Sequence, residues 1–141
     1  MSGRVAPIRF EVSCEEAYDY LIDPANRVEW QSSLRRVEQV RGPDGVIGQT
    51  WIDVTTAGMR PLMELTDAER PHRWSEVGRW RGFGATLTLT FTPVGSFCDV
   101  TPSMSVYASG LLRPIGGLLD RLAPLAVRSD LRRAATILAR R

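Results

Sequence analysis

Residues 85–91 read Ala85-Thr86-Leu87-Thr88-Leu89-Thr90-Phe91, an uninterrupted alternation of apolar and hydroxyl side chains. Successive side chains of a β-strand point to opposite faces of the sheet, so this pattern predicts a strand with one face in a core and the other in solvent. Such alternation is typical of an antiparallel sheet that is covered on one face only.

The segments on both sides of this strand have a similar character. Residues rich in β-branched and aromatic side chains, bounded by Gly, Pro, Asp or Ser, predict further strands at 5–12, 34–41, 49–55, 60–69, 73–77 and 98–107. Because the connections between most of them are short, we expect a curved antiparallel sheet of about seven strands.

Two short helices are expected after the first strand. Ser13 begins one of them, because its hydroxyl can accept from a free N–H of the first turn and Glu16 completes a capping box. Asp23 and Pro24 begin the other as N-cap and first helical residue, and this helix runs towards Trp30.

A long helix is expected from about Pro114 to the end, with Pro124 kinking or dividing it. Its apolar residues recur at helical spacing: Ile115, Leu118, Leu119, Leu122, Leu125, Ala126, Leu131, Ala134, Ala135 and Leu138. The apolar face of the sheet needs a cover, and no other expected element is large enough. The sequence therefore predicts one α+β domain over residues 1–141, with this helix on the concave face of the sheet.

The composition excludes several kinds of chemistry. The chain has no lysine, which excludes Schiff-base catalysis and a P-loop. One histidine, His72 in an expected turn, and two separated cysteines predict neither a metal site nor a catalytic triad, and no cofactor is expected.

A net charge of +2 does not indicate a nucleic-acid partner. No apolar run is long enough to span a membrane and residues 1–7 lack a signal-peptide pattern, so we expect a cytoplasmic location.

Taken together, these segments resemble the helix-grip superfamily (SRPBCC), which includes START domains, Bet v 1 allergens and bacterial polyketide cyclase/dehydrase-like proteins. The resemblance covers nearly the whole chain and rests on the first strand with residues 13–21, on Asp23, Pro24 and Asn26 with Trp30, on Gly48, and on residues 69–74, 111–114 and 130–133. It implies a helix-grip fold. It also implies that Cys14 and Cys98 lie close together, since the first and last strands would pair, and a cytoplasmic location would keep both reduced.

The leading functional hypothesis is the binding of a small hydrophobic molecule, such as a lipid, polyketide or aromatic metabolite, between the sheet and the last helix. Large apolar side chains are the expected ligand contacts, although they could equally fill a solid core: Trp30, Trp51, Met63, Trp74, Trp80, Leu87, Leu89, Met104, Leu118 and Leu122.

The alternative hypothesis is a polyketide cyclase or dehydratase that acts in the same cavity. Its acid/base candidates are Asp53, Glu64, Glu76 and Tyr107. A carboxyl in an apolar pocket has a raised pKa and can serve as a general acid or base. Acidic residues of antiparallel strands can instead face solvent. Arg60 or Arg79 would pair with one of the carboxylates or with an acidic ligand.

A protein-interaction module is the third hypothesis. Its contacts would be a glycine-bounded loop at residues 78–84, which contains Trp80 and Phe83, or the arginines of the last helix, Arg132, Arg133, Arg140 and Arg141. The same arginines would also be favoured by the helix dipole alone. A homodimer is compatible with either surface.

Overall fold

The computed structural model describes residues 6–141, so the part of the expected first strand at Val5 lies outside the described residues. The chain order is β1 (Ile8–Phe10), α1 (Cys14–Ile22), α2 (Pro24–Trp30), β2 (Leu34–Arg41), β3 (Thr50–Thr55), β4 (Leu62–Glu69), β5 (Arg73–Trp80), β6 (Phe83–Val94), β7 (Phe97–Ala108), the 3-10 turn η1 (Gly110–Leu112) and α3 (Arg113–Ala139).

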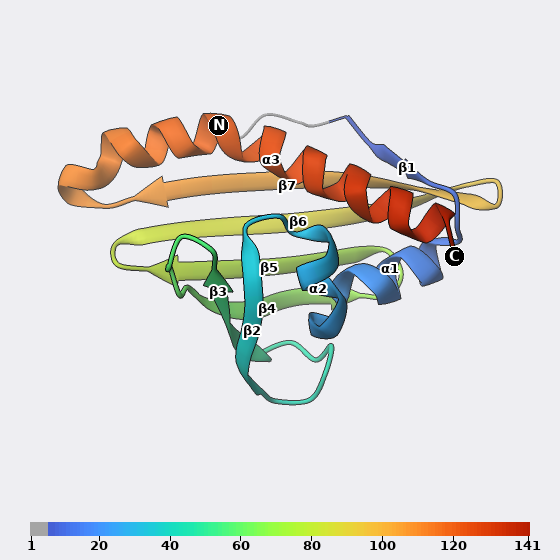
Figure 1. Cartoon of the computed structure of the whole chain (residues 1–141), viewed down its shortest axis with the longest axis horizontal. Coiled ribbons are helices and arrows are strands. Elements are labelled where there is room, and N and C mark those ends of the chain that lie inside the picture. Colours follow the sequence, from blue (N-terminus) through green and yellow to red (C-terminus); the bar gives the residue numbers. More distant parts are fainter. Residues whose placement is uncertain (1–5) are drawn as a thin grey trace.

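All seven strands form one antiparallel sheet in the order β1-β7-β6-β5-β4-β3-β2. Helix α3 runs along the sheet next to β7 and β1, and α1 and α2 follow β1 (Figure 1). This confirms the predicted α+β helix-grip fold. We call the sheet face that carries Leu87 and Met104 the inner face, because α3 packs on that side.

The predicted starts of the two short helices are confirmed. The Ser13 hydroxyl accepts a hydrogen bond from the Glu16 N–H at 3.2 Å, and the Asp23 carboxylate accepts one from the Ala25 N–H at 2.9 Å. These bonds satisfy N–H groups that the first turn leaves without a helical partner, which is why both helices begin where the sequence predicts.

The expected loop at residues 78–84 is instead the end of a hairpin. Strand β5 continues to Trp80 and β6 begins at Phe83, so only Arg81 and Gly82 form the turn. Both residues have positive φ angles, 47° and 81°, as a two-residue turn of type I′ requires. The sequence did not predict this turn because Arg at its first position is not a typical turn signal.

Helix α3 corrects part of two further expectations. Pro124 lies inside a single helix and does not divide it. The buried residues of the helix are Gly116, Leu131, Ala134 and Leu138. The last three belong to the expected apolar face, but Ile115, Leu118, Leu122 and Leu125 of that face are exposed. A Cβ atom on Gly116 would lie 2.8 Å from Ala108, so only glycine allows the helix to approach β7 this closely.

Cys14 and Cys98 lie together where β1 pairs with β7, as expected. Their Cα atoms are 4.9 Å apart and their sulfur atoms form a disulfide, so the expectation of two reduced thiols is wrong in this structure. The expected cytoplasmic location, on which the reduced state depended, stays a prediction. Among the described residues, no helix has both the length and the apolar character needed to cross a bilayer.

Candidate functional site

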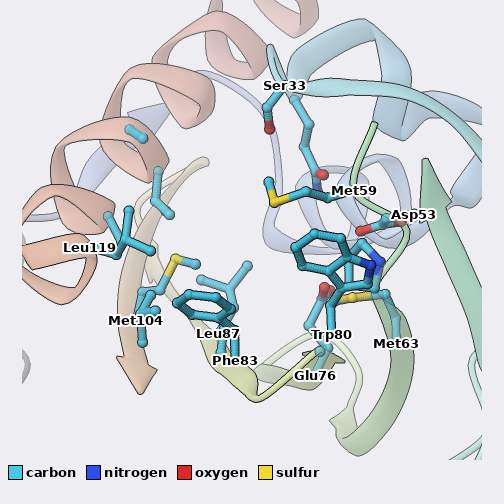
Figure 2. Close-up of a pocket in the computed structure, with 18 of the residues that line it drawn as sticks. Ser33, Asp53, Met59, Met63, Glu76, Trp80, Phe83, Leu87, Met104 and Leu119 are labelled. Atoms are coloured by element: carbon cyan, nitrogen blue, oxygen red, sulfur yellow. The ribbon is translucent and has the colours of Figure 1, made fainter. Parts of the chain in front are cut away.

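A cavity of about 370 Å³ lies between the inner face of the sheet, α2 and α3. Figure 2 shows Met104 and Leu119 on one side of this space and Met59, Asp53 and Trp80 on the other. The lining is mostly apolar, with a few polar groups, and the volume lies in the range of small-molecule sites.

Half of the predicted ligand contacts line this cavity: Trp30, Met63, Trp80, Leu87 and Met104. Three others, Trp51, Trp74 and Leu89, are buried in the core outside the lining. Leu118 and Leu122 are exposed on the outer side of α3, so their assignment to the cavity is wrong. Nothing in the structure tests whether the five lining residues contact a ligand, and that role stays a prediction.

Helix α3 lines the cavity with Leu119, Ala123, Ala126 and Val127. Their sequence spacings of four, three and one residues place them on one side of the helix. Leu119 and Ala126 belong to the expected apolar face, whereas Ala123 and Val127 were not selected. The expected face was too wide because it also included the outer leucines, and small residues fit better where a helix lies close to a sheet.

Phe83 also lines the cavity and was not predicted as a contact. It precedes Ala85 and Leu87 at two-residue intervals on β6, so all three point to the inner face. The alternation at residues 85–91 could have located Phe83 if the strand had been extended by two residues.

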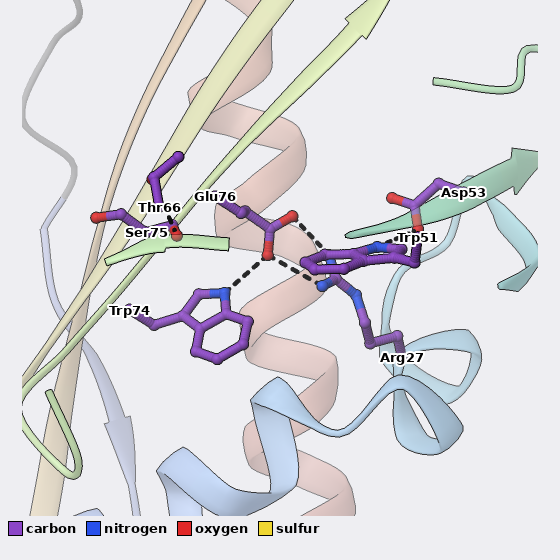
Figure 3. Close-up of polar contacts among 7 residues, drawn as sticks. All are labelled: Arg27, Trp51, Asp53, Thr66, Trp74, Ser75 and Glu76. Carbon is purple, nitrogen blue, oxygen red and sulfur yellow. Dashed lines mark hydrogen bonds and ion pairs between the residues drawn. The ribbon is translucent and has the colours of Figure 1, made fainter. Parts of the chain in front are cut away.

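Glu76 belongs to a buried ion pair next to the cavity. Arg27 of α2 donates to both of its carboxylate oxygens, at 3.0 and 2.8 Å, and the Trp74 indole N–H donates at 2.9 Å (Figure 3). Arg27 is 2% exposed and Glu76 is 4% exposed. The Arg27 guanidinium also lies over the Trp51 ring, 5.2 Å from its centroid. Arg27 is thus held by a bidentate carboxylate and an aromatic face.

The pKa of Arg27 is raised. Burial by itself lowers it, but the negative charges of Glu76 and Asp53 outweigh that effect. Arg27 was not predicted because the residue lies in the middle of α2, far along the chain from Glu76. Arg60 and Arg79 were the expected partners. Arg60 donates to Glu38 at 2.6 Å and Arg79 is exposed, so neither pairs with the cavity carboxylates.

Asp53 is the second carboxyl at the cavity and is 7% exposed. The Trp51 indole N–H donates to its Oδ1 atom at 3.0 Å (Figure 3). Burial raises the pKa of Asp53 to about 6; the charge of Arg27 lowers it, and that of Glu76 raises it further. The carboxyl therefore changes its protonation state close to neutral pH, as an acid/base group requires.

This pKa predicts a pH-dependent stability. Because the folded-state pKa exceeds the usual 3.8, the contribution of Asp53 is fully present below about pH 4 and is lost as the pH rises through about 6. We expect Asp53→Asn to be more stable than the wild type by roughly 2–3 kcal/mol at pH 7.5 and equally stable at pH 4. Urea denaturation of both proteins between pH 4 and 7.5 measures this difference. A constant difference across this range would contradict the raised pKa.

Glu64 and Tyr107 do not reach the cavity, so their selection as inward-facing groups is wrong. Met63 and Leu65 are buried towards the inner face, which turns Glu64 between them to the outer face. Tyr107 lies next to the inward-facing Val106 and packs over Gly84 on the outer face, where a Cβ on that glycine would lie 2.2 Å from the ring. Strand alternation explains both placements.

Trp30 brings an unpaired donor to the site. It lines the cavity and is almost fully buried, and its indole N–H has no hydrogen-bond partner among residues 6–141. A buried donor without a partner costs about 1–3 kcal/mol.

The chain is similar to proteins with this same architecture. A family model described as "Polyketide cyclase / dehydrase and lipid transport" matches residues 5–141. No curated protein matches the sequence.

Solved structures that resemble the chain share its fold at low sequence identity. A protein from Mesorhizobium loti has a TM-score of 0.76 at 15% identity and covers 98% of both chains. A conserved protein from Geobacillus kaustophilus has a TM-score of 0.73 at 17% identity, over 96% of this chain and 93% of that one. Ara h 8.0201 has a TM-score of 0.75 at 8% identity, over 99% of this chain and all of the other.

At these identities the structures show the fold alone, and the family match supports hydrophobic ligand binding in general. The chain belongs to the polyketide cyclase/dehydrase and lipid transport family.

Proposed function

We propose that this protein binds one small, mostly apolar molecule in the cavity between the sheet and α3. The observation that carries the proposal is the open space of about 370 Å³ beside a core that is already well packed. Ordinary protein interiors have few voids larger than a water molecule, so a space of this size in a small domain is a feature that needs a function.

The polar groups of the cavity limit the chemistry of the ligand. Its apolar body would contact Leu87, Met104 and Leu119. Asp53 offers a polar contact, as a hydrogen-bond donor below about pH 6 and as an acceptor at any pH. A lipid or an aromatic or polyketide-like compound with a carbonyl or hydroxyl group fits these contacts.

Filling the cavity tests this proposal. Ala85 lines the cavity from β6, and Thr86, its neighbour, belongs to the opposite face of the strand. We expect Ala85→Trp to weaken binding of the fluorescent probe N-phenyl-1-naphthylamine at least roughly tenfold, because the indole would occupy the space that the probe needs. Thr86→Trp is the matched control and should bind the probe as the wild type does.

Two results would reject the proposal. One is equal probe affinity for wild type and Ala85→Trp, which would place the probe elsewhere. The other is a wild-type protein that neither binds the probe nor shows a co-purifying adduct in native mass spectrometry.

A second candidate function, a cyclase or dehydratase, is favoured by one observation. Asp53 combines a position in an apolar cavity with a pKa of about 6, which suits a general acid or base. Incubation with short poly-β-ketone thioesters should then yield products that have lost water, as seen by mass spectrometry. Asp53→Asn should lose this activity and keep probe binding. Turnover that persists in this variant would exclude Asp53 as the catalytic group.

A further inference from the structure

The outer side of α3 exposes a row of large apolar residues that we call the leucine stripe: Leu111, Ile115, Leu118, Leu122 and Leu125. Leu111 is 99% exposed, and the other four are 49–67% exposed. The positions follow one another at steps of four and three, so the four residues within α3 lie on one side of the helix, and Leu111 in η1 begins the row. Contiguous exposed apolar residues of this kind mark an interaction surface in a folded protein.

The opposite side of α3 is fixed to the protein. Gly116 packs against Ala108 of β7, and the Asp120 carboxylate accepts a hydrogen bond from the Val106 N–H at 2.7 Å. Rotating α3 to bury the leucine stripe would break both contacts. Nothing among residues 6–141 covers the stripe, so any cover has to come from outside the described chain.

The charges along α3 favour an anionic partner. Arg121 and Arg132 are exposed and lie about three helical turns apart along one border of the stripe. Arg128 lies between them and donates to the Ala6 carbonyl at 2.7 Å. Both acidic residues of the helix point towards the protein, since Asp120 binds β7 and Asp130 accepts from the Ser32 hydroxyl at 2.8 Å. The solvent-facing side of α3 is therefore apolar in the middle and basic at one border.

We propose that the leucine stripe and its basic border dock on an anionic lipid surface. An apolar face of leucines next to arginines is the pattern of helices that lie in the plane of a membrane interface. Two copies that packed this face with their helices antiparallel would bring their basic borders close together, and the repulsion disfavours that dimer. The stripe also lies beside the cavity, because Leu119 and Ala126 of the same helix line it.

Vesicle flotation with the full chain tests this surface. We expect the wild type to bind phosphatidylcholine vesicles that contain 30% phosphatidylglycerol and to bind pure phosphatidylcholine much more weakly. Leu118→Ser with Leu122→Ser should weaken binding to the anionic vesicles at least roughly tenfold, since two half-exposed leucines no longer enter the interface. Both sites are exposed, so the variant should fold normally. The matched control is Val40→Ser with Leu62→Ser, two similarly exposed apolar residues of the sheet, and it should bind like the wild type.

The basic border has its own variant. Arg121→Gln with Arg132→Gln should weaken binding to anionic vesicles, by roughly fivefold for each arginine, and should reduce its dependence on salt. No binding of the wild type to anionic vesicles, or equal binding of the Leu118→Ser/Leu122→Ser variant, would overturn the proposal. A wild-type dimer in sedimentation that this variant abolishes, without any vesicle binding, would make a second copy the occupant and would also overturn it.

These outcomes are separate from those of the proposed function. The leucine stripe lies outside the cavity, so Leu118→Ser with Leu122→Ser should bind N-phenyl-1-naphthylamine with wild-type affinity. If the probe does not bind at all but the vesicles do, the cavity function fails while the docking surface stands.

Discussion

Replacing Arg27 with methionine is expected to lower the free energy of unfolding by about 3–5 kcal/mol. Among residues 6–141, the Trp74 indole N–H would then be the one side-chain donor left to the buried Glu76 carboxylate. Its charge would have no counter-charge within the core, which is the most expensive state for such a group. Urea denaturation monitored by circular dichroism measures the loss.

A double-mutant cycle separates the ion pair from the packing of the two side chains. Arg27→Met combined with Glu76→Gln removes both charges and keeps an acceptor for Trp74, so we expect it to recover most of the stability that Arg27→Met loses. Losses that simply add in the double variant would show that Arg27 and Glu76 do not stabilise each other. Arg27→Met should also raise the pKa of Asp53 above about 6, because the Arg27 charge lowers it in the wild type.

Reducing the Cys14–Cys98 disulfide is expected to cost up to about 4–5 kcal/mol of unfolding free energy. The bond joins residues 84 positions apart, and closing so long a loop removes much conformational entropy from the unfolded chain. Engineered and natural disulfides commonly give about 2–5 kcal/mol. Urea denaturation with and without dithiothreitol measures the effect, and the variant Cys14→Ala/Cys98→Ala should show no response to the reductant.

The same measurement bears on where the protein works. Cys98 is fully buried and Cys14 nearly so, so a reductant should reach the bond only when the chain opens. Two free thiols in the denatured, non-reduced protein would contradict the disulfide and would agree with the cytoplasmic location that the sequence predicts. A disulfide that survives purification without oxidant would argue for an oxidising compartment.

On the strands, the candidate site was predictable where alternation was enough. Leu87 and Met104 were selected correctly for the inner face, and the same rule, applied from Met63, would have turned Glu64 outward. Tyr107 could have been excluded in the same way from its neighbour Val106. Arg27 could not be found by any local rule, because its partner Glu76 comes from another element 49 positions later.

The sequence by itself determined both helix N-caps and most of the strands, because each depends on neighbours within a few residues; the short connections then indicated an antiparallel sheet. Only the tertiary structure decided that the first half of α3 turns Gly116, and not Leu118 or Leu122, towards the sheet. The close approach of the helix to Ala108 requires glycine there. The tertiary structure also decided that the interior holds a cavity and that the pKa of Asp53 lies near 6. Both depend on how closely separate elements approach one another and on how much water they exclude.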